Sequence, residues 1–382
     1  MANNYSDDCY EVLRLLKERR NVLISGAPGT GKSRLLGNIA EAFCKSPMEE
    51  MPAPAPVHVP ANKVPIPRTV PTEVDTKLQS VWPAPTRTNR KVFRTVFHQN
   101  SKYRDFLTGV MPTTSTDGEQ KFKVVAGILY RASEHAKLAD GASLLIIDEI
   151  NRGPAVQIFG GSIVAIEVDK RLNSDNSHRT ETQYFELLDP KTGESIEYAF
   201  PENLYILAAM NQADVSVEPL DVAFLRRWAP FPLMPSPQVL YNYFNITSGP
   251  RLPLPDNPNT SADVYNAAIR AWDEINKRIA IGRGKEFQLG HGIFLVGNPA
   301  PPTDLQEALT LVNQIWGYIR AHIDEVFFGD TRAISVTLNI GQTNPIYHLE
   351  TLMFADEPRS IISGPDKIDE SNVYSLLRAI AG

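Results

Sequence analysis

The sequence predicts an α/β protein in which a parallel sheet is followed by a smaller helical region. Three apolar runs, at 21–24, 143–147 and 204–210, are typical of parallel strands that are buried on both faces. Polar or glycine-rich residues follow each run directly. Beyond Pro235 no such run recurs, and apolar residues return at spacings of three and four, which indicates helices. The chain therefore divides into a sheet-containing region and a helical region.

The composition is that of a globular protein in water. The 382 residues are 42% hydrophobic and 21% charged, and this length suits roughly two or three domains. No apolar run is long enough to span a membrane, and the N-terminus lacks the features of a signal peptide. Only Cys9 and Cys44 occur, without metal-binding spacing, so we expect a cytoplasmic location and no membrane partner. The formal net charge of −6 argues against a surface that binds nucleic acid throughout.

A phosphate-binding loop follows the first strand. Gly26 and Gly31 enclose four residues, and Lys32 and Ser33 follow, which is the P-loop spacing. Glycines let backbone N–H groups turn inward, and the helix that begins near Lys32 adds the positive end of its dipole. The lysine is expected to reach the β- and γ-phosphates, and the serine hydroxyl to bind Mg²⁺. The predicted nucleotide-binding residues are Gly26, Ala27, Pro28, Gly29, Thr30, Gly31, Lys32, Ser33 and Arg34.

Two segments flank this loop and its helix. Residues 7–20 place Tyr10, Leu13 and Leu16 at helical spacing, which predicts a short amphipathic helix before the first strand. The P-loop helix is expected to continue to about residue 43. Residues 46–90 contain ten prolines and no sustained period, so we expect an insertion outside the fold rather than a partner-binding arm.

A second group of elements precedes the central strand. A strand is predicted at 91–97 and a helix at 127–138. Between them, turn residues near 116–119 and the run at 121–125 predict a small hairpin. All of these lie between the proline-rich segment and the central apolar run.

Two acidic residues end the central apolar run. Asp148 and Glu149 close the strand predicted at 143–147. Ligands of open α/β sheets bind at the carboxyl ends of the strands, so these carboxylates are expected beside the phosphate loop. Asp148 is predicted to hold Mg²⁺ through its water shell, and Glu149 to orient or deprotonate an attacking water. A strand that ends in acids at a simple turn is the alternative.

Further polar residues are placed to complete such a site. Asn211 ends the run at 204–210 and is predicted to position the hydrolytic water. Arg226 and Arg227 come at the end of a predicted short helix, and their guanidinium groups suit a phosphate held by a neighbouring subunit. A solvated basic helix end is the alternative interpretation. Residues 154–170 are predicted to be helical, and 184–199 to form two short strands around a turn.

The C-terminal region is predicted to be mainly helical. Apolar residues recur at helical spacing over 264–279 and 305–323. Residues 333–340 alternate strictly, which predicts a half-buried strand. A last helix is expected at 370–380.

The P-loop, acidic strand end, amide and arginine pair, in this order, resemble the core of an AAA+ ATPase. Further stretches are similar to the McrB family, the motor subunits of modification-dependent restriction systems. These stretches are 97–106, Asp148-Glu-Ile-Asn-Arg152, 201–205, Met210-Asn-Gln-Ala-Asp214, Leu225-Arg-Arg-Trp228, Gln288-Leu-Gly-His-Gly-Ile-Phe294 and 316–330. The similarity covers about 20–45 and 91–330. It implies a five-stranded parallel sheet with helices on both faces in 1–234 and a helical lid in 235–330. The family does not explain residues 331–382, which are expected to form a C-terminal extension.

The resemblance also implies a mechanism. Subunits would form a ring of about six with ATP or GTP and Mg²⁺ at each interface. Asn211 would be sensor 1, Arg226 and Arg227 the arginine fingers, and Arg152 would also act across the interface. The hairpins around 110–125 and 184–199 would face a central pore through which DNA could pass. A McrC-like or nuclease chain would be the partner in a defence system.

Several alternatives stay open. Gln212 and Val215 stand where McrB proteins have Thr and Arg, so the sequence does not choose firmly between ATP and GTP, although ATP is slightly favoured. No domain that reads modified DNA is expected before the P-loop. A MoxR-type ATPase that remodels proteins has the same core. A nucleotide-gated assembly scaffold, in which slow hydrolysis times disassembly, is the third possibility.

Overall fold

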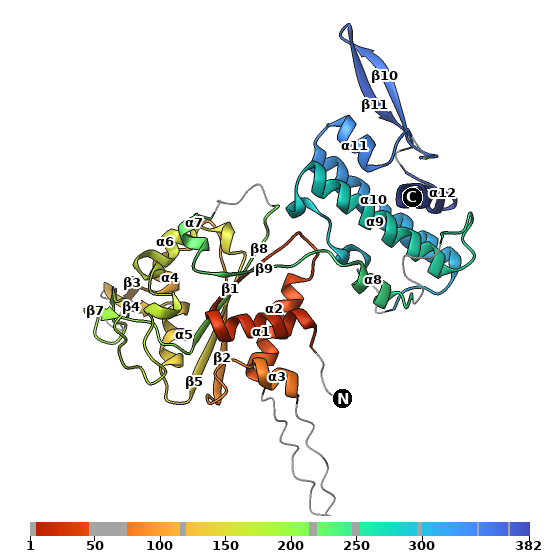
Figure 1. Ribbon diagram of the computed structural model, residues 1–382. Helices are drawn as coiled ribbons and strands as arrows, with labels where there is room; N and C mark the ends of the chain where they lie inside the picture. The colour runs from red at the N-terminus through yellow and green to blue at the C-terminus, as the bar shows by residue number, and fades with distance from the viewer. Residues whose placement is uncertain are drawn as a thin grey trace, which may run out of the picture. The chain divides into compact units, whose positions relative to one another are not determined.

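The computed structural model describes residues 5–45, 75–114, 120–213, 220–246, 253–295, 300–341, 344–365 and 367–382. The chain forms two compact units (Figure 1). The sheet unit comprises residues 1–25, 33–210 and 215–231, and the helical unit comprises 26–32, 211–214 and 232–382. The phosphate-loop residues therefore group with the helical unit.

The sheet unit is organised around a five-stranded sheet of order β2-β5-β8-β1-β9. Its strands are β1 (Asn21–Ser25), β2 (Asn89–Val96), β5 (Gly141–Asp148), β8 (Leu204–Met210) and β9 (Ala229–Pro232). The β2–β5, β5–β8 and β8–β1 pairs are parallel, so the carboxyl ends of these four strands share one edge. The α/β fold predicted from the sequence is confirmed.

The central strands are uniformly apolar because helices cover both faces of the sheet. Leu23, Leu145 and Ile147 are buried in a cluster with α5 and α6, whereas Tyr205 contacts the ring of Phe43 of α2 on the other face, with ring centroids 5.7 Å apart. Figure 1 shows α1 to α3 on one side of the sheet and α4 to α7 on the other. The helices are α1 (Asp7–Arg19), α2 (Lys32–Cys44), α3 (Thr76–Val81), α4 (Tyr103–Phe106), α5 (Ile128–Ala136), α6 (Ala155–Phe159) and α7 (Val222–Leu225).

The last part of the predicted proline-rich insertion belongs to the fold, so that prediction is wrong for these residues. Asp75 caps α3, since its carboxylate accepts the N–H of Leu78 at 2.8 Å. Leu78 and Trp82 are buried, and the indole of Trp82 donates to the carbonyl of Ala42 at 3.2 Å. A single helical turn is too short to show a period in the sequence. Residues 46–74 lie outside the described residues.

The helix predicted at 154–170 is broken into short pieces. After α6 the chain forms 3₁₀ turns at Gly160–Ile163 and Val168–Lys170. Gly160 has a φ of 50°, and a Cβ there would lie 2.8 Å from the ring of Tyr103. The chain therefore bends where the sequence pattern alone suggested continuity.

Both predicted hairpins are confirmed. One consists of β3 (Thr108–Thr114) and β4 (Gln120–Ala126), and the other of β6 (Phe185–Leu188) and β7 (Ser195–Tyr198). Both are antiparallel. The turn of the first, at 115–119, lies outside the described residues. Whether these hairpins face a pore stays a prediction.

A fully buried arginine ties the sheet to the chain that follows α6. The guanidinium of Arg171 donates to the carbonyls of Ile166 and Leu204 and, at 2.6 Å, to the side-chain oxygen of Asn21. Burial lowers the pKa of Arg171 to about 9.

We expect Arg171→Met to lower the free energy of unfolding by about 3 kcal/mol, because three buried acceptors lose their donor. Urea denaturation measures the loss, and the exposed Arg131→Met serves as the control. Equal stability of the two variants would contradict this role.

The helical unit has its own hydrophobic core, in which Trp272 and Trp316 are buried. Its elements are α8 (Pro237–Tyr243), α9 (Ser261–Gly282), α10 (Leu305–Phe327), α11 (Thr331–Thr337), β10 (His348–Phe354), β11 (Glu357–Ser363) and α12 (Glu370–Ala381). The helices predicted at 264–279, 305–323 and 370–380 are confirmed. In the described ranges, no helix has the length and apolar character needed to cross a membrane.

The strand predicted at 333–340 is wrong, because α11 occupies most of it. The carboxylate of Asp330 accepts the N–H of Ala333 at 2.9 Å and starts the helix. Ile334, Thr337 and Leu338 are then buried at spacings of three and four. The antiparallel β10–β11 hairpin that follows was not predicted.

Candidate nucleotide site

The candidate site begins at the carboxyl edge of the sheet. Strands β5, β8 and β1 are neighbours and end at Asp148, Met210 and Ser25. The acidic pair, Asn211 and the phosphate loop therefore continue from adjacent parallel strands. In open α/β sheets this is the edge where ligands bind. The sequence predicted each of these segments at a strand end, but it did not predict the order of the strands in the sheet.

The backbone of the phosphate loop requires its glycines. Gly29 and Gly31 have φ values of 76° and 89°, in the left-handed region that favours glycine. A Cβ at Gly26 would lie 2.4 Å from the carbonyl oxygen of Leu233. The hydroxyl of Thr30 donates to the carbonyl of Ala27 at 2.9 Å, which ties the turn together. The loop therefore adopts a specific backbone conformation in addition to having the P-loop spacing.

Lys32 lies against the loop that it closes. Its ammonium donates to the carbonyls of Gly26 and Ala27, at 2.8 and 2.9 Å. Ser33 and Arg34 follow in the first turn of α2 and are exposed. No acidic residue occupies that turn, so its N–H groups and positive dipole end are not neutralised locally. These residues fit a polyphosphate.

A Gly-His-Gly segment contacts the phosphate loop within the helical unit. The N–H groups of Gly290 and Gly292 donate to the carbonyls of Pro28 and Gly29, at 3.0 and 2.8 Å. A Cβ at Gly290 would lie only 2.1 Å from the carbonyl carbon of Gly29. His291, between the two glycines, is 8% exposed. Sequence analysis did not assign these residues to the site, although they belong to a stretch that carries the family resemblance.

The acidic pair has an unusual backbone. Glu149 has φ 51° and ψ 47°, a left-handed conformation that costs a non-glycine residue about 1–2 kcal/mol. The N–H of Glu149 donates to the carboxylate of Asp148 at 3.0 Å, and its own carboxylate lies 3.2 Å from Nε of Arg152. Strain of this kind is common at functional positions. The structure therefore brings Asp148, Glu149 and Arg152 together.

A divalent cation would have few protein ligands here. Among the described residues no group of three or more His, Cys, Asp and Glu side chains could hold a metal. Ser33 and Asp148 offer a hydroxyl and a carboxylate, which are the hard oxygen ligands that Mg²⁺ takes together with phosphates and water. The residues present fit Mg²⁺ bound with a nucleotide rather than a preformed metal centre.

The structure separates the two adjacent arginines. Arg227 is 6% exposed at its side chain, and its Nε lies 2.9 Å from a carboxylate oxygen of Glu167. Arg226 caps the C-terminal end of α7 and is exposed. Asn211 accepts the N–H of Ala213 at 3.4 Å through its side-chain oxygen. The side chain of Arg226 is therefore exposed to solvent, whereas that of Arg227 is buried and paired with Glu167.

A family model covers the acidic pair, Asn211 and the arginines of the candidate site, but not the phosphate loop. This model, described as AAA domain (dynein-related subfamily), matches residues 79–228, which run from α3 through the acidic pair to the arginines. The chain is 24% identical over 329 residues to the type IV methyl-directed restriction enzyme EcoKMcrB subunit of Escherichia coli K12, covering 84% of this chain and 56% of the relative. It is 36% identical over 86 residues to the type II restriction enzyme BsuMI component YdiS of Bacillus subtilis 168, covering 22% and 25%. The chain therefore spans only part of each relative.

Solved structures give weak similarities. A candidate ATPase from Cytophaga hutchinsonii matches at TM-score 0.31 and 12% identity, over 84% of this chain and 62% of the other. NtrX from Brucella abortus matches at TM-score 0.30 and 12% identity, over 87% and 63%. These scores add nothing to the fold assignment, which rests on the sheet and the family match. The family model shows an AAA domain over residues 79–228, and the chain as a whole is similar to McrB-like restriction components.

Proposed function

We propose that the chain is a ring-forming motor that hydrolyses ATP or GTP where its subunits meet. The observation that carries this proposal is the exposed guanidinium of Arg226 next to the bound one of Arg227. An arginine that completes a neighbour's site must be able to extend from its own surface, and of these two arginines Arg226 meets that condition. Arg227 instead holds α7 in place through Glu167.

The residues divide the work of hydrolysis between them. The loop Gly26–Lys32 binds the phosphates, and Ser33 and Asp148 would hold Mg²⁺, which would neutralise charge on the phosphates. Glu149 accepts a proton from the attacking water, and Arg152 keeps the Glu149 carboxylate oriented. Asn211 positions the water.

The wider role follows from the relatives. Both relatives are named as components of restriction enzymes, so we propose that this chain works on DNA with a nuclease partner in a defence system in the cytoplasm. A ring of about six subunits would place the β3–β4 and β6–β7 hairpins at its pore. Residues 1–234 would form the AAA+ domain, 235–330 the lid and 331–382 an extension.

The role of Arg226 gives a direct test. Arg226→Ala should lower hydrolysis by about 1,000-fold or more, because charge developing on the neighbour's γ-phosphate loses its partner. Nucleotide affinity of the isolated subunit should stay unchanged. Mixing Arg226→Ala with Lys32→Ala subunits should restore part of the activity, since some interfaces then combine an intact loop with an intact arginine. Phosphate release and nucleotide-binding titrations measure both effects.

The exposed Arg131→Ala is the matched control and should hydrolyse at the rate of the parent protein. Full activity of Arg226→Ala would remove Arg226 from the reaction. If mixed subunits assemble yet stay inactive, Arg226 acts within its own subunit and the interface proposal is wrong.

A further inference from the structure

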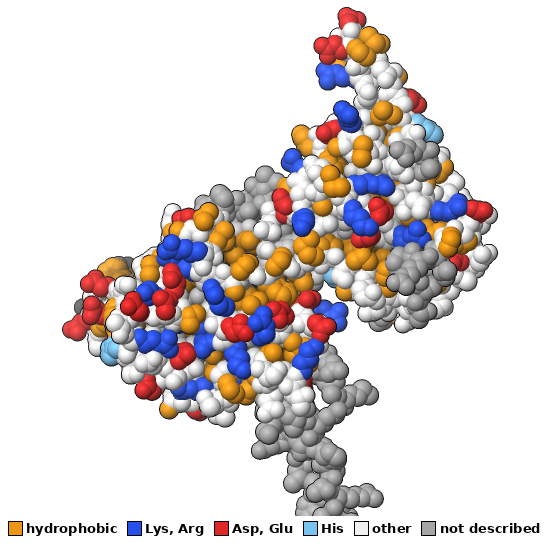
Figure 2. Space-filling model, viewed as in Figure 1, with side chains coloured by type: hydrophobic (Ala, Val, Ile, Leu, Met, Phe, Trp, Pro, Cys, Tyr) orange, Lys and Arg blue, Asp and Glu red, His pale blue; other side chains and the backbone are white. Residues whose placement is uncertain are grey.

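The β10–β11 hairpin is the most exposed element of the helical unit. All seven residues of β10 are exposed, and so is most of β11. Figure 1 shows the hairpin extending away from the helices, and Figure 2 shows hydrophobic side chains next to acidic ones towards its end. An isolated two-stranded hairpin is marginally stable in water. An exposed apolar hairpin of this kind is typical of an interaction surface.

The hairpin register gathers apolar side chains at its tip. Met353 pairs with Pro358 and Phe354 pairs with Glu357, on opposite faces. Met353 and Phe354 are 70% and 71% exposed. The turn between the strands contains Asp356, and Glu357 follows with an ion pair to the exposed Arg359 at 3.2 Å. The tip is therefore apolar and carries a net negative charge. A surface that receives it should be an apolar groove with a positive rim.

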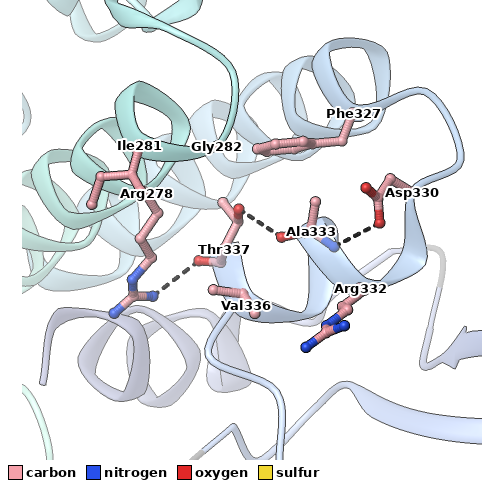
Figure 3. Close-up of a pocket in the computed structure, with 9 residues that line it drawn as sticks. All are labelled: Arg278, Ile281, Gly282, Phe327, Asp330, Arg332, Ala333, Val336 and Thr337. Atoms are coloured by element: carbon pink, nitrogen blue, oxygen red, sulfur yellow. Dashed lines mark hydrogen bonds between the residues drawn. The ribbon is translucent and has the colours of Figure 1, made fainter.

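A groove with these properties lies in the same unit. The ends of α9 and α10 and the outer side of α11 surround a cavity of about 320 Å³, which we call the α9–α11 groove (Figure 3). Phe327 and Val336 contribute apolar surface, and Ile281 at its edge is 88% exposed. Arg332 supplies an exposed positive charge at the same groove, and Arg278 a second guanidinium. Asp330 also lines the groove, and its carboxylate caps α11, so the groove carries a net positive charge.

The tip cannot reach the groove of its own chain. A seven-residue strand is about 24 Å long, so the tip lies roughly that far from the base of the hairpin. The base is next to α11, which lines the groove, and Ile362 near the base packs against the core of the unit. We propose that the hairpin tip of one copy docks into the α9–α11 groove of a second copy. Phe354 fills the cavity, and Asp356 and Glu357 face Arg332.

This contact goes beyond the proposed nucleotide interface and does not depend on it. The two surfaces are different patches of the same chain, so the contact is head-to-tail and repeats around a ring or along a filament. It would hold subunits together whether or not nucleotide is bound. The opposite charges of the tip and the groove favour this head-to-tail orientation over contacts between two tips or two grooves.

Disulfide trapping tests the proposal in the full chain. In a Cys44→Ser background, which leaves only the buried Cys9, one sample carries Phe354→Cys and another Ile281→Cys. After mild oxidation the mixture should give a cross-linked dimer on a non-reducing gel, and each sample alone should not. The exposed Tyr318→Cys on α10 replaces Ile281→Cys in the control mixture. A yield no higher than in that control would overturn the proposal.

Charge reversal gives a second, independent measurement. Glu357→Arg and Arg332→Glu should each raise the concentration needed for assembly by about tenfold, and the double variant should restore it. Light scattering without nucleotide reads this out, and thermal unfolding checks that each variant is folded. Assembly that ignores both reversals would mean that the hairpin binds another protein, and the proposal would fail. Adding Glu149→Gln to both cysteine samples should leave the yield of cross-linked dimer unchanged. The docking proposal and the role of Glu149 in hydrolysis can therefore fail separately.

Discussion

Glu149→Gln should bind nucleotide as tightly as the parent protein and hydrolyse it at least about 100-fold more slowly. A glutamine keeps the shape of the side chain but cannot accept a proton from water, and the loss of a general base typically costs a factor of 10² to 10⁴. The backbone of Glu149 stays left-handed in the variant, so the site is not otherwise disturbed. Phosphate release with saturating ATP and with GTP, and nucleotide titration, are the two measurements.

The left-handed backbone at Glu149 leads to a further expectation, which concerns stability. Glu149→Gly and Glu149→Ala both remove the carboxylate and its pair with Arg152, and both should be inactive. Glycine tolerates a φ of 51° whereas alanine does not, so the glycine variant should be more stable by about 1 kcal/mol. The exposed Glu18→Gln on α1 is the control for hydrolysis. Equal turnover by Glu149→Gln and the parent would assign activation of the water to another group.

The fold could be predicted where burial on both faces left a continuous apolar run. Strands β1, β5 and β8 show such runs because their neighbours cover them completely. The strand predicted at 333–340 was wrong because β-branched residues alternate there, while the helix depends on a cap from Asp330 that lies outside the alternating run. The β10–β11 hairpin escaped prediction because its two strands are exposed and carry no burial pattern.

The sequence could predict only those features of the site that follow from the order of its residues along the chain. The spacing of the loop, Asp148 and Asn211 placed them after successive strands, and the sheet order made those strands neighbours. The sequence could not distinguish Arg226 from Arg227, since the partner that binds Arg227 is Glu167, far away in the chain. Contacts of Gly290 with the phosphate loop likewise depend on tertiary structure. Position along the chain gives candidate residues, and burial and pairing guide the roles that we propose for them.

Lys32→Ala should abolish nucleotide binding, with an affinity loss of at least about 100-fold, and hydrolysis should disappear with it. Each hydrogen bond to a charged group contributes about 1.5–3 kcal/mol, and the ammonium would make bonds to the phosphates in place of those to Gly26 and Ala27. Stability should fall by about 1–3 kcal/mol, because Gly26 and Ala27 are buried and their carbonyls lose a charged donor. Titration with a fluorescent nucleotide and thermal unfolding measure the two quantities.

The comparison with Glu149→Gln makes this prediction specific. Arg19→Ala removes an exposed positive charge from α1 and is the control for a general loss of charge. If Lys32→Ala still binds nucleotide with parent affinity, the loop does not bind the phosphates, and the positive φ values of Gly29 and Gly31 need another explanation. If binding is lost but is also lost in Glu149→Gln, the two residues share one structural role. Loss of binding in the first variant with tight, unproductive binding in the second follows only if the loop binds the nucleotide and the carboxylate acts on water.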